Sequence, residues 1–192
     1  MNASSSVYIE DTRRWLERAV IGLNLCPFAK AVHVKQQIHY ALSQAQGVNE
    51  LRDELVTQLR ELVNLNADVR ETTLLIVPTV LRDFLDFNDF LAQAEEVLMA
   101  LDLEGVIQIA SFHPNYQFAG TRADDITNFT NRSPYPILHL IREASIDRAV
   151  DAFPDPESIF ETNMQTLENL GPAGWAALDV GSTQTPESRH ET

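Results

Sequence analysis

The stretch Thr72-Thr73-Leu74-Leu75-Ile76-Val77 decides the fold class, because it is an uninterrupted run of β-prone residues that Pro78 ends. A strand without polar alternation is covered on both faces, as in a sheet that carries helices on each side. On either side of this run lie segments with apolar residues at helical spacing, over 48–63 and 87–101. We therefore expect a sheet packed between helices.

Two further strands are expected outside those helices. Residues 34–42 alternate between apolar and polar side chains, the pattern of a half-buried strand, and residues 106–112 form an apolar run after Gly105. The order of strand, helix, strand, helix and strand predicts neighbouring parallel strands in an α/β or α+β domain. A mixed sheet is the open alternative.

Helices are predicted at both ends of this βαβαβ core. Residues 11–25 carry an apolar stripe at helical spacing, with Asp11 or Thr12 as the cap. After an irregular loop, two C-terminal helices are predicted over 136–150 and 156–170, the second ended by Gly171-Pro172. We expect one globular domain over residues 1–175 and a disordered polar tail over 176–192.

Composition limits the classes of function. The chain has 192 residues and a formal net charge of −14, so binding to nucleic acid or to an anionic membrane is not expected, since both need a basic surface. Its single cysteine, Cys26, allows no intramolecular disulfide. Without a signal-peptide pattern or a membrane-spanning run, the sequence predicts a cytoplasmic protein.

Polar residues gather after the last of the three predicted strands. His113 follows residues 106–112 directly, and Pro114 biases its backbone toward an extended conformation. If that strand is parallel to its neighbours, His113 lies at the carboxyl edge of the sheet, where α/β proteins bind ligands. The alternative is a histidine that only hydrogen-bonds to a loop carbonyl group.

A second group of candidates lies on the predicted helix over 136–150. There His139, Arg142 and Glu143 are one turn apart and share a helix face. Together with His113, His139 and Glu143 would form a two-histidine, one-carboxylate set that suits zinc or iron. They could equally transfer protons, or simply form hydrogen bonds and ion pairs without a ligand.

An anion site is predicted where that helix begins. Asn131, Arg132 and Ser133 precede it, and free backbone N–H groups at a helix start favour a negative charge. Arg132 and Arg142 would then hold a carboxylate or a phosphate. The alternative is that Ser133 only caps the helix and Arg132 is a solvated loop residue.

Cys26 lies between the first predicted helix and Pro27. If Pro27 begins a short helix, Cys26 becomes its N-cap and the thiolate is stabilised; if Cys26 only ends the first helix, the dipole disfavours the thiolate. The favoured interpretation is a buried, inert thiol. A nucleophilic, metal-binding or redox-sensing thiol is the alternative.

Three segments carry a family resemblance. They are residues 15–28 (WLERAVIGLNLCPF), 111–114 (SFHP) and 130–136 (TNRSPYP). Together they resemble the bacterial domain-of-unknown-function 1415 family, over residues 12–175 of this chain. The resemblance implies no activity, cofactor or site residue.

The leading functional hypothesis is a small enzyme that acts on an anionic metabolite. In it His113 is an acid, a base or a metal ligand, Arg132 and Arg142 hold the anion, and His139 with Glu143 complete a metal or proton-transfer site. The alternatives are a ligand- or peptide-binding protein without catalysis and a redox sensor based on the single cysteine. The leading arrangement requires His113 and His139 to share one cavity.

Overall fold

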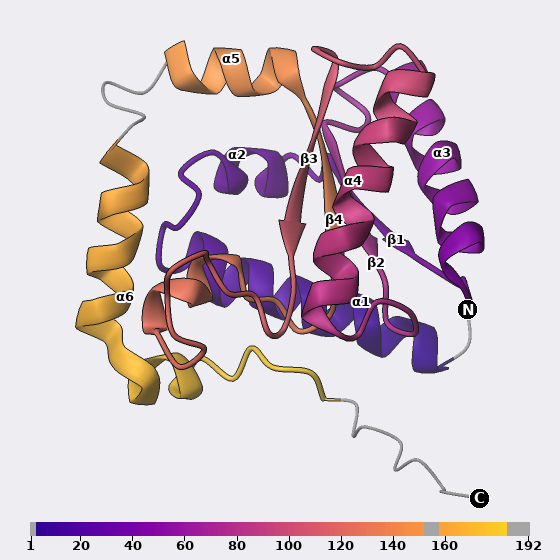
Figure 1. Cartoon of the computed structure of the whole chain (residues 1–192). Coiled ribbons are helices and arrows are strands. Elements are labelled where there is room, and N and C mark those ends of the chain that lie inside the picture. Colours follow the sequence, from indigo (N-terminus) through magenta and orange to yellow (C-terminus); the bar gives the residue numbers. More distant parts are fainter. Residues whose placement is uncertain (1–2, 152–157, 184–192) are drawn as a thin grey trace, which may run out of the picture.

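A four-stranded sheet lies at the centre of the computed structural model, which describes residues 3–151 and 158–183 (Figure 1). Its strands are β1 (Ile38–Leu42), β2 (Thr72–Ile76), β3 (Ile107–Phe112) and β4 (Ile137–Arg142), in the order β1-β2-β4-β3. β1 and β2 are parallel, whereas β4 is antiparallel to both of its neighbours. The fold is therefore mixed α/β, which confirms the predicted class.

β4 occupies part of the segment for which the sequence predicts a helix over 136–150. That prediction is wrong for Ile137–Arg142, which pairs with β2 on one side and β3 on the other. Because this central strand is covered on both faces, Ile137, Leu138 and Leu140 are all buried and no period-two pattern marks it. β4 also separates β2 from β3, so these two parallel strands are not neighbours.

Two long helices cover one face of the sheet. They are α3 (Val48–Asn64) and α4 (Phe84–Ala100), close to the predicted ranges. Their buried residues form one core cluster with Leu75, Leu138 and Leu140 of β2 and β4. Since alternate residues of a strand point to opposite faces, the neighbouring residues of β2 and β4 face the other side.

The N-terminal helices cover part of that other side. α1 (Ala3–Trp15) continues into a π-helix, η1 (Leu16–Ile21), and a short helix, α2 (Ala29–Val34), follows. Trp15 of α1 packs there against Ile137 of β4 in a second core cluster. α2 includes the first residue of the predicted strand over 34–42, and the strand itself begins only at Ile38.

Asp11 lies inside α1, so the prediction that it caps a helix is wrong. Its carboxylate accepts hydrogen bonds from Tyr135 Oη at 2.6 Å, from the backbone N–H of Thr183 at 2.8 Å and from Arg14 at 2.8 Å. Val180 is buried against the same helix. These contacts anchor residues 178–183 to α1, in contrast to the predicted tail over 176–192, of which residues 184–192 lie outside the described part.

Three more helices complete the described part of the fold. α5 (Glu143–Asp151) follows β4 directly, the 3₁₀ helix η2 (Ile126–Asn131) lies in the loop after β3, and α6 (Ser158–Ala177) packs against η2. α6 breaks at Gly171, whose φ is 65°, where the sequence predicts a helix end. Its predicted start at residue 156 is outside the described residues.

No helix within 3–151 or 158–183 is both long and apolar enough to cross a membrane.

Candidate functional site

His113 lies in the core between β3 and α4, and its side chain is fully buried. Its ring packs against Phe84 and Phe87, with ring centroids 5.4 and 5.1 Å away. Nδ1 accepts the backbone N–H of Asn115 at 3.0 Å, so Nε2 carries the proton and donates to the carbonyl oxygen of Leu81 at 3.2 Å. Burial lowers the pKa of this imidazole. Both ring nitrogens thus have hydrogen-bond partners in the backbone. His113 therefore fits the alternative prediction, a histidine that only forms hydrogen bonds within the protein.

His139 points to the opposite face of the sheet from His113. Its neighbours Leu138 and Leu140 pack with α3 and α4, so His139 faces α2. Glu143 begins α5 and does not line the cavity that His139 faces. The predicted metal set of His113, His139 and Glu143 is therefore not assembled, and the described residues hold no group of three or more His, Cys, Asp or Glu placed to bind a metal.

Arg142 binds backbone carbonyl groups and is thus not free to hold an anion as predicted. It donates to the carbonyl oxygens of Leu62, Leu65 and Arg70 at 2.6, 2.7 and 3.2 Å. Leu62 and Leu65 lie at the C-terminal end of α3, where the last carbonyl groups of a helix favour a nearby cation. Arg142 is therefore a helix-capping residue in the structure.

Arg132 also forms hydrogen bonds with the backbone. It donates to two loop carbonyl oxygens, and its guanidinium lies 4.2 Å from the ring centre of Phe129. Asn131 and Ser133 likewise donate to carbonyl oxygens. Because the strand β4 follows them, no helix N-terminus is present there to bind an anion. These residues organise the loop between β3 and β4, and the predicted anion site is not formed.

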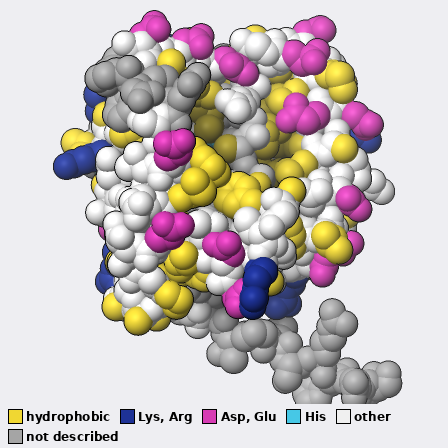
Figure 2. All heavy atoms as spheres, turned by 60° about the vertical axis from the view of Figure 1, so that its left-hand side comes forward, with side chains coloured by type: hydrophobic (Ala, Val, Ile, Leu, Met, Phe, Trp, Pro, Cys, Tyr) yellow, Lys and Arg dark blue, Asp and Glu magenta, His cyan; other side chains and the backbone are white. Residues whose placement is uncertain are grey.

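A cavity of about 790 Å³ opens on the face of the sheet opposite α3 and α4. Ile38, Thr72, His139 and Ile141 of the sheet form its floor, and residues of α2 and α5 form two of its walls. Figure 2, which brings this side forward, shows apolar side chains lining a hollow with acidic side chains around it. A cavity of this size and lining suits a small molecule.

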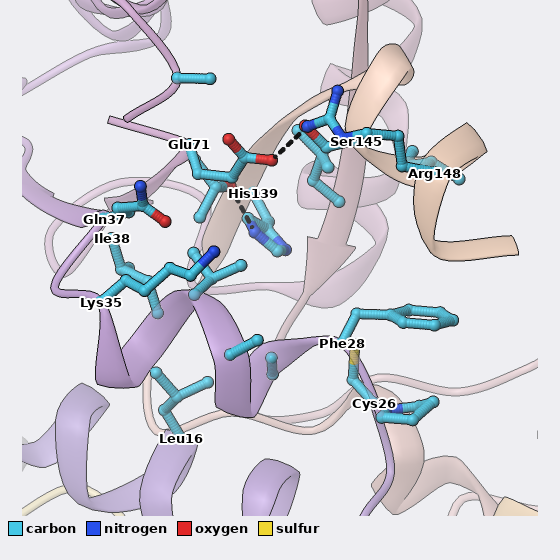
Figure 3. A pocket seen from close by; sticks show the side chains of 18 of the residues that line it. Leu16, Cys26, Phe28, Lys35, Gln37, Ile38, Glu71, His139, Ser145 and Arg148 are labelled. Carbon is cyan, nitrogen blue, oxygen red and sulfur yellow. Dashed lines mark hydrogen bonds and ion pairs between the residues drawn. The ribbon is translucent and has the colours of Figure 1, made fainter. Parts of the chain in front are cut away.

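His139 is a basic group on the floor of this cavity (Figure 3). The Thr72 hydroxyl has one hydrogen, which it donates to the carbonyl oxygen of Leu140 at 2.6 Å. Its oxygen must therefore accept from Nε2–H of His139, 2.7 Å away. The neutral ring then carries a lone pair on Nδ1, which has no partner among the described residues. Burial lowers the pKa of this ring to about 4.

The imidazole of His139 is expected to remain neutral down to about pH 4, because protonation would place a positive charge in an apolar site. Long-range ¹H–¹⁵N NMR should show an Nε2–H tautomer at neutral pH and a titration midpoint far below the ordinary pKa of 6.5. The signals of His139 are assigned as those that are missing from the spectrum of a His139→Gln variant. An Nδ1–H tautomer, or a midpoint above about pH 6, would contradict the geometry.

Cys26 lines the same cavity, from the turn between η1 and α2. Burial raises the pKa of its thiol, and hydrogen bonds from the backbone N–H groups of Phe28 and Ala29 oppose that rise only in part. The thiol is therefore protonated at neutral pH. Asn163 of α6 holds the turn by donating to the carbonyl oxygen of Leu25 at 2.9 Å.

Charged side chains lie at the rim of the cavity. Glu71, before β2, and Arg148 of α5 form an ion pair of 3.0 Å. The ammonium group of Lys35, at the end of α2, has no ion pair or hydrogen bond with any described residue. Figure 3 shows the Lys35 side chain pointing into the cavity toward His139. The exposed residue Asp68 supplies a second carboxylate.

One family model matches residues 7–177, and its description is a protein of unknown function (DUF1415). The chain belongs to this family. The match confirms the resemblance seen in the sequence and includes every residue that lines the cavity. No curated protein and no solved structure matches the chain.

Of the residues that line this cavity in the DUF1415 chain, the sequence singles out His139 and Cys26 but not Thr72, Lys35 or the ion pair of Glu71 with Arg148. Lys35 lies in the segment predicted as a strand, where alternation would make it a solvated residue. The only signal at Thr72 is a polar side chain at the start of an apolar strand. Its contact with His139 depends on the pairing of β2 with β4, which no sequence pattern reveals.

Proposed function

We propose that this chain is an enzyme that binds a small anionic molecule with an apolar body in the cavity and takes a proton from it with His139. One observation carries the proposal: Thr72 fixes a neutral imidazole on the floor of an apolar cavity, with Nδ1 unpaired. A base with a free lone pair and a locked tautomer is what general base catalysis requires. The proposal thus keeps the catalytic role predicted for His139. It gives no catalytic role to His113 or Glu143 and includes no metal bound by these three residues.

The low pKa of His139 fits an anionic ligand better than a neutral one. At a pKa of about 4 the ring is a weak base in the empty cavity. A negative charge bound nearby stabilises the imidazolium form and raises the pKa toward neutrality. Binding of an anion would therefore make Nδ1 a stronger base, and the proton is afterwards returned to the product or to water.

Cys26 plays a passive part in this proposal. Its protonated thiol contributes apolar surface to the cavity wall and does not attack the ligand. A reducing compartment, which we propose to be the cytoplasm, keeps this single cysteine as a thiol. The net charge of −14 supports a small molecule and not nucleic acid as the partner.

The proposal is tested by incubating the purified protein with a metabolite extract and following all compounds by mass spectrometry. Wild-type protein should consume at least one mainly apolar anion, and His139→Gln should not. His39→Gln is the matched control, because His39 lies in the edge strand β1 and does not line the cavity. Equal consumption by the His139→Gln variant would rule out the proposed base.

The second candidate function is ligand binding without catalysis, which the weak basicity of His139 favours. In that case Nδ1 would only accept a hydrogen bond from the ligand. The same incubation distinguishes the two functions. A compound that is retained by the protein through gel filtration, but is recovered unchanged and binds less tightly to His139→Gln, would support the binding protein and contradict the enzyme.

A further inference from the structure

We infer that the ligand of this cavity is an apolar monocarboxylate whose carboxylate binds the ammonium group of Lys35. The inference rests on the proposed function of the cavity and names its substrate class. It assigns the anion to a residue other than the two arginines, Arg132 and Arg142, that the sequence suggests.

Lys35 is the cation at the rim that remains available. The Arg148 guanidinium lies 3.0 Å from a Glu71 carboxylate oxygen and 3.0 Å from Ser145 Oγ, so its charge is already compensated. Lys35 has no such partner within the described residues, and its side chain points into the cavity (Figure 3). An ammonium group is a compact charge with three donors, which suits one carboxylate without a fixed two-pronged geometry.

The negative surroundings limit the ligand to one negative charge. The exposed carboxylate of Asp68 lines the same cavity, acidic side chains surround the hollow in Figure 2, and the chain carries a net charge of −14. Each further negative charge on a ligand is repelled by these carboxylates, while one ammonium group can neutralise only the first. A carboxylate therefore fits better than a phosphate dianion.

The apolar lining of the rest of the cavity favours a ligand that is apolar apart from its carboxylate. Leu16, Val32, Ile38 and Ile141 present apolar surface from η1, α2, β1 and β4. A polar body would lose its hydration there without gaining hydrogen bonds. Since Lys35 points toward His139, a carboxylate at Lys35 also brings the negative charge near the imidazole.

The test compares three probes with eight carbon atoms each by isothermal titration calorimetry: octanoate, its neutral amide octanamide, and octyl phosphate at about pH 8, where the phosphate is a dianion. Octanoate is expected to bind wild-type protein about tenfold more tightly than either of the others. Lys35→Gln should remove the preference for octanoate over octanamide. Lys30→Gln is the matched control, because Lys30 is also on α2 and exposed but does not line the cavity.

Alkylation of Cys26 by iodoacetamide reports independently whether a probe enters the cavity, since the chain has no other cysteine. If all three probes bind with equal affinity and slow the alkylation, or if octyl phosphate binds most tightly, the substrate class is wrong and the cavity still binds ligands. If Lys35→Gln retains the preference for octanoate, the role of Lys35 is wrong. If no probe binds or protects Cys26, the inference and the proposed function both fail.

Discussion

Replacing Asp11 with alanine is expected to lower the free energy of unfolding by about 3 kcal/mol, because the change removes the acceptor of the buried Tyr135 hydroxyl and also breaks hydrogen bonds from Arg14 and Thr183. Asp11 is 1% exposed, and its carboxylate accepts from Tyr135 Oη, from Arg14 and from both the backbone N–H and the hydroxyl of Thr183. These bonds tie three distant parts of the chain together. Urea denaturation measures the loss.

The same interactions give the stability a defined pH dependence. Burial by itself would raise the pKa of Asp11, but hydrogen bonds from Tyr135, Thr183 and Arg14 outweigh it and lower the pKa below 3.8. A carboxyl group with a lowered pKa in the folded state stabilises the fold above its unfolded pKa. This stabilisation should be present above about pH 4 and disappear as the pH falls through the lowered pKa.

Asp179→Asn is the control for this prediction, because asparagine tolerates the positive φ of 52° at this position. Asp179 is exposed, and its ion pair with Arg18 is 3.4 Å long, so the loss of this charge should change the free energy of unfolding by less than about 0.5 kcal/mol. The assignment of Asp11 as the anchor of residues 178–183 would be wrong if Asp11→Ala cost no more than the control. It would also be wrong if the variant kept the acid sensitivity of the wild type.

Replacing His139 with glutamine is expected to reduce turnover of the consumed compound about 10³-fold, the usual contribution of a positioned general base. The glutamine amide can donate to Thr72 Oγ1 as Nε2–H does, so the hydrogen bond to β2 is retained. What it lacks is a basic lone pair in place of Nδ1. The kinetic parameters kcat and KM should be measured for wild type and variant by mass spectrometry.

A drop in kcat with little change in KM would indicate a role in proton transfer, whereas a rise in KM alone would indicate a role only in binding. His113→Gln provides the contrast, since His113 is fully buried and bonded at both nitrogens. That variant should be less stable than the wild type, but the molecules that remain folded should have an unchanged kcat. Equal turnover by His139→Gln and wild type would contradict the assignment of His139 as the base.

Much of the fold could be predicted because its elements have clear periodic patterns. α3 has apolar residues at helical spacing, and β2 is an apolar run ended by Pro78. β4 could not be recognised, because residues 137, 138, 140 and 141 are all apolar and fit a helix as well as a strand covered on both faces. The β-pairing on both sides of β4 overrides the local preference.

The error at β4 also explains what was missed at the site. Placing His139, Arg142 and Glu143 on one helix face gives them a common direction, whereas in the structure His139 points into the cavity and Arg142 caps α3. His113 was expected at a ligand-binding edge of the sheet, but packing against α4 buries it. The cavity lies instead where β1 and β2 begin, near Ile38 and Thr72.

The central claim is that His139 acts on a ligand held in this cavity, and a crystal structure of the His139→Gln variant with the compound that the wild type consumes tests it most directly. We expect the compound to fill the cavity, with its anionic group at Lys35 and its reacting atom within hydrogen-bond distance, about 3 Å, of the side chain at position 139. The compound bound elsewhere, for example beside Arg132 in the loop between β3 and β4, would contradict the account.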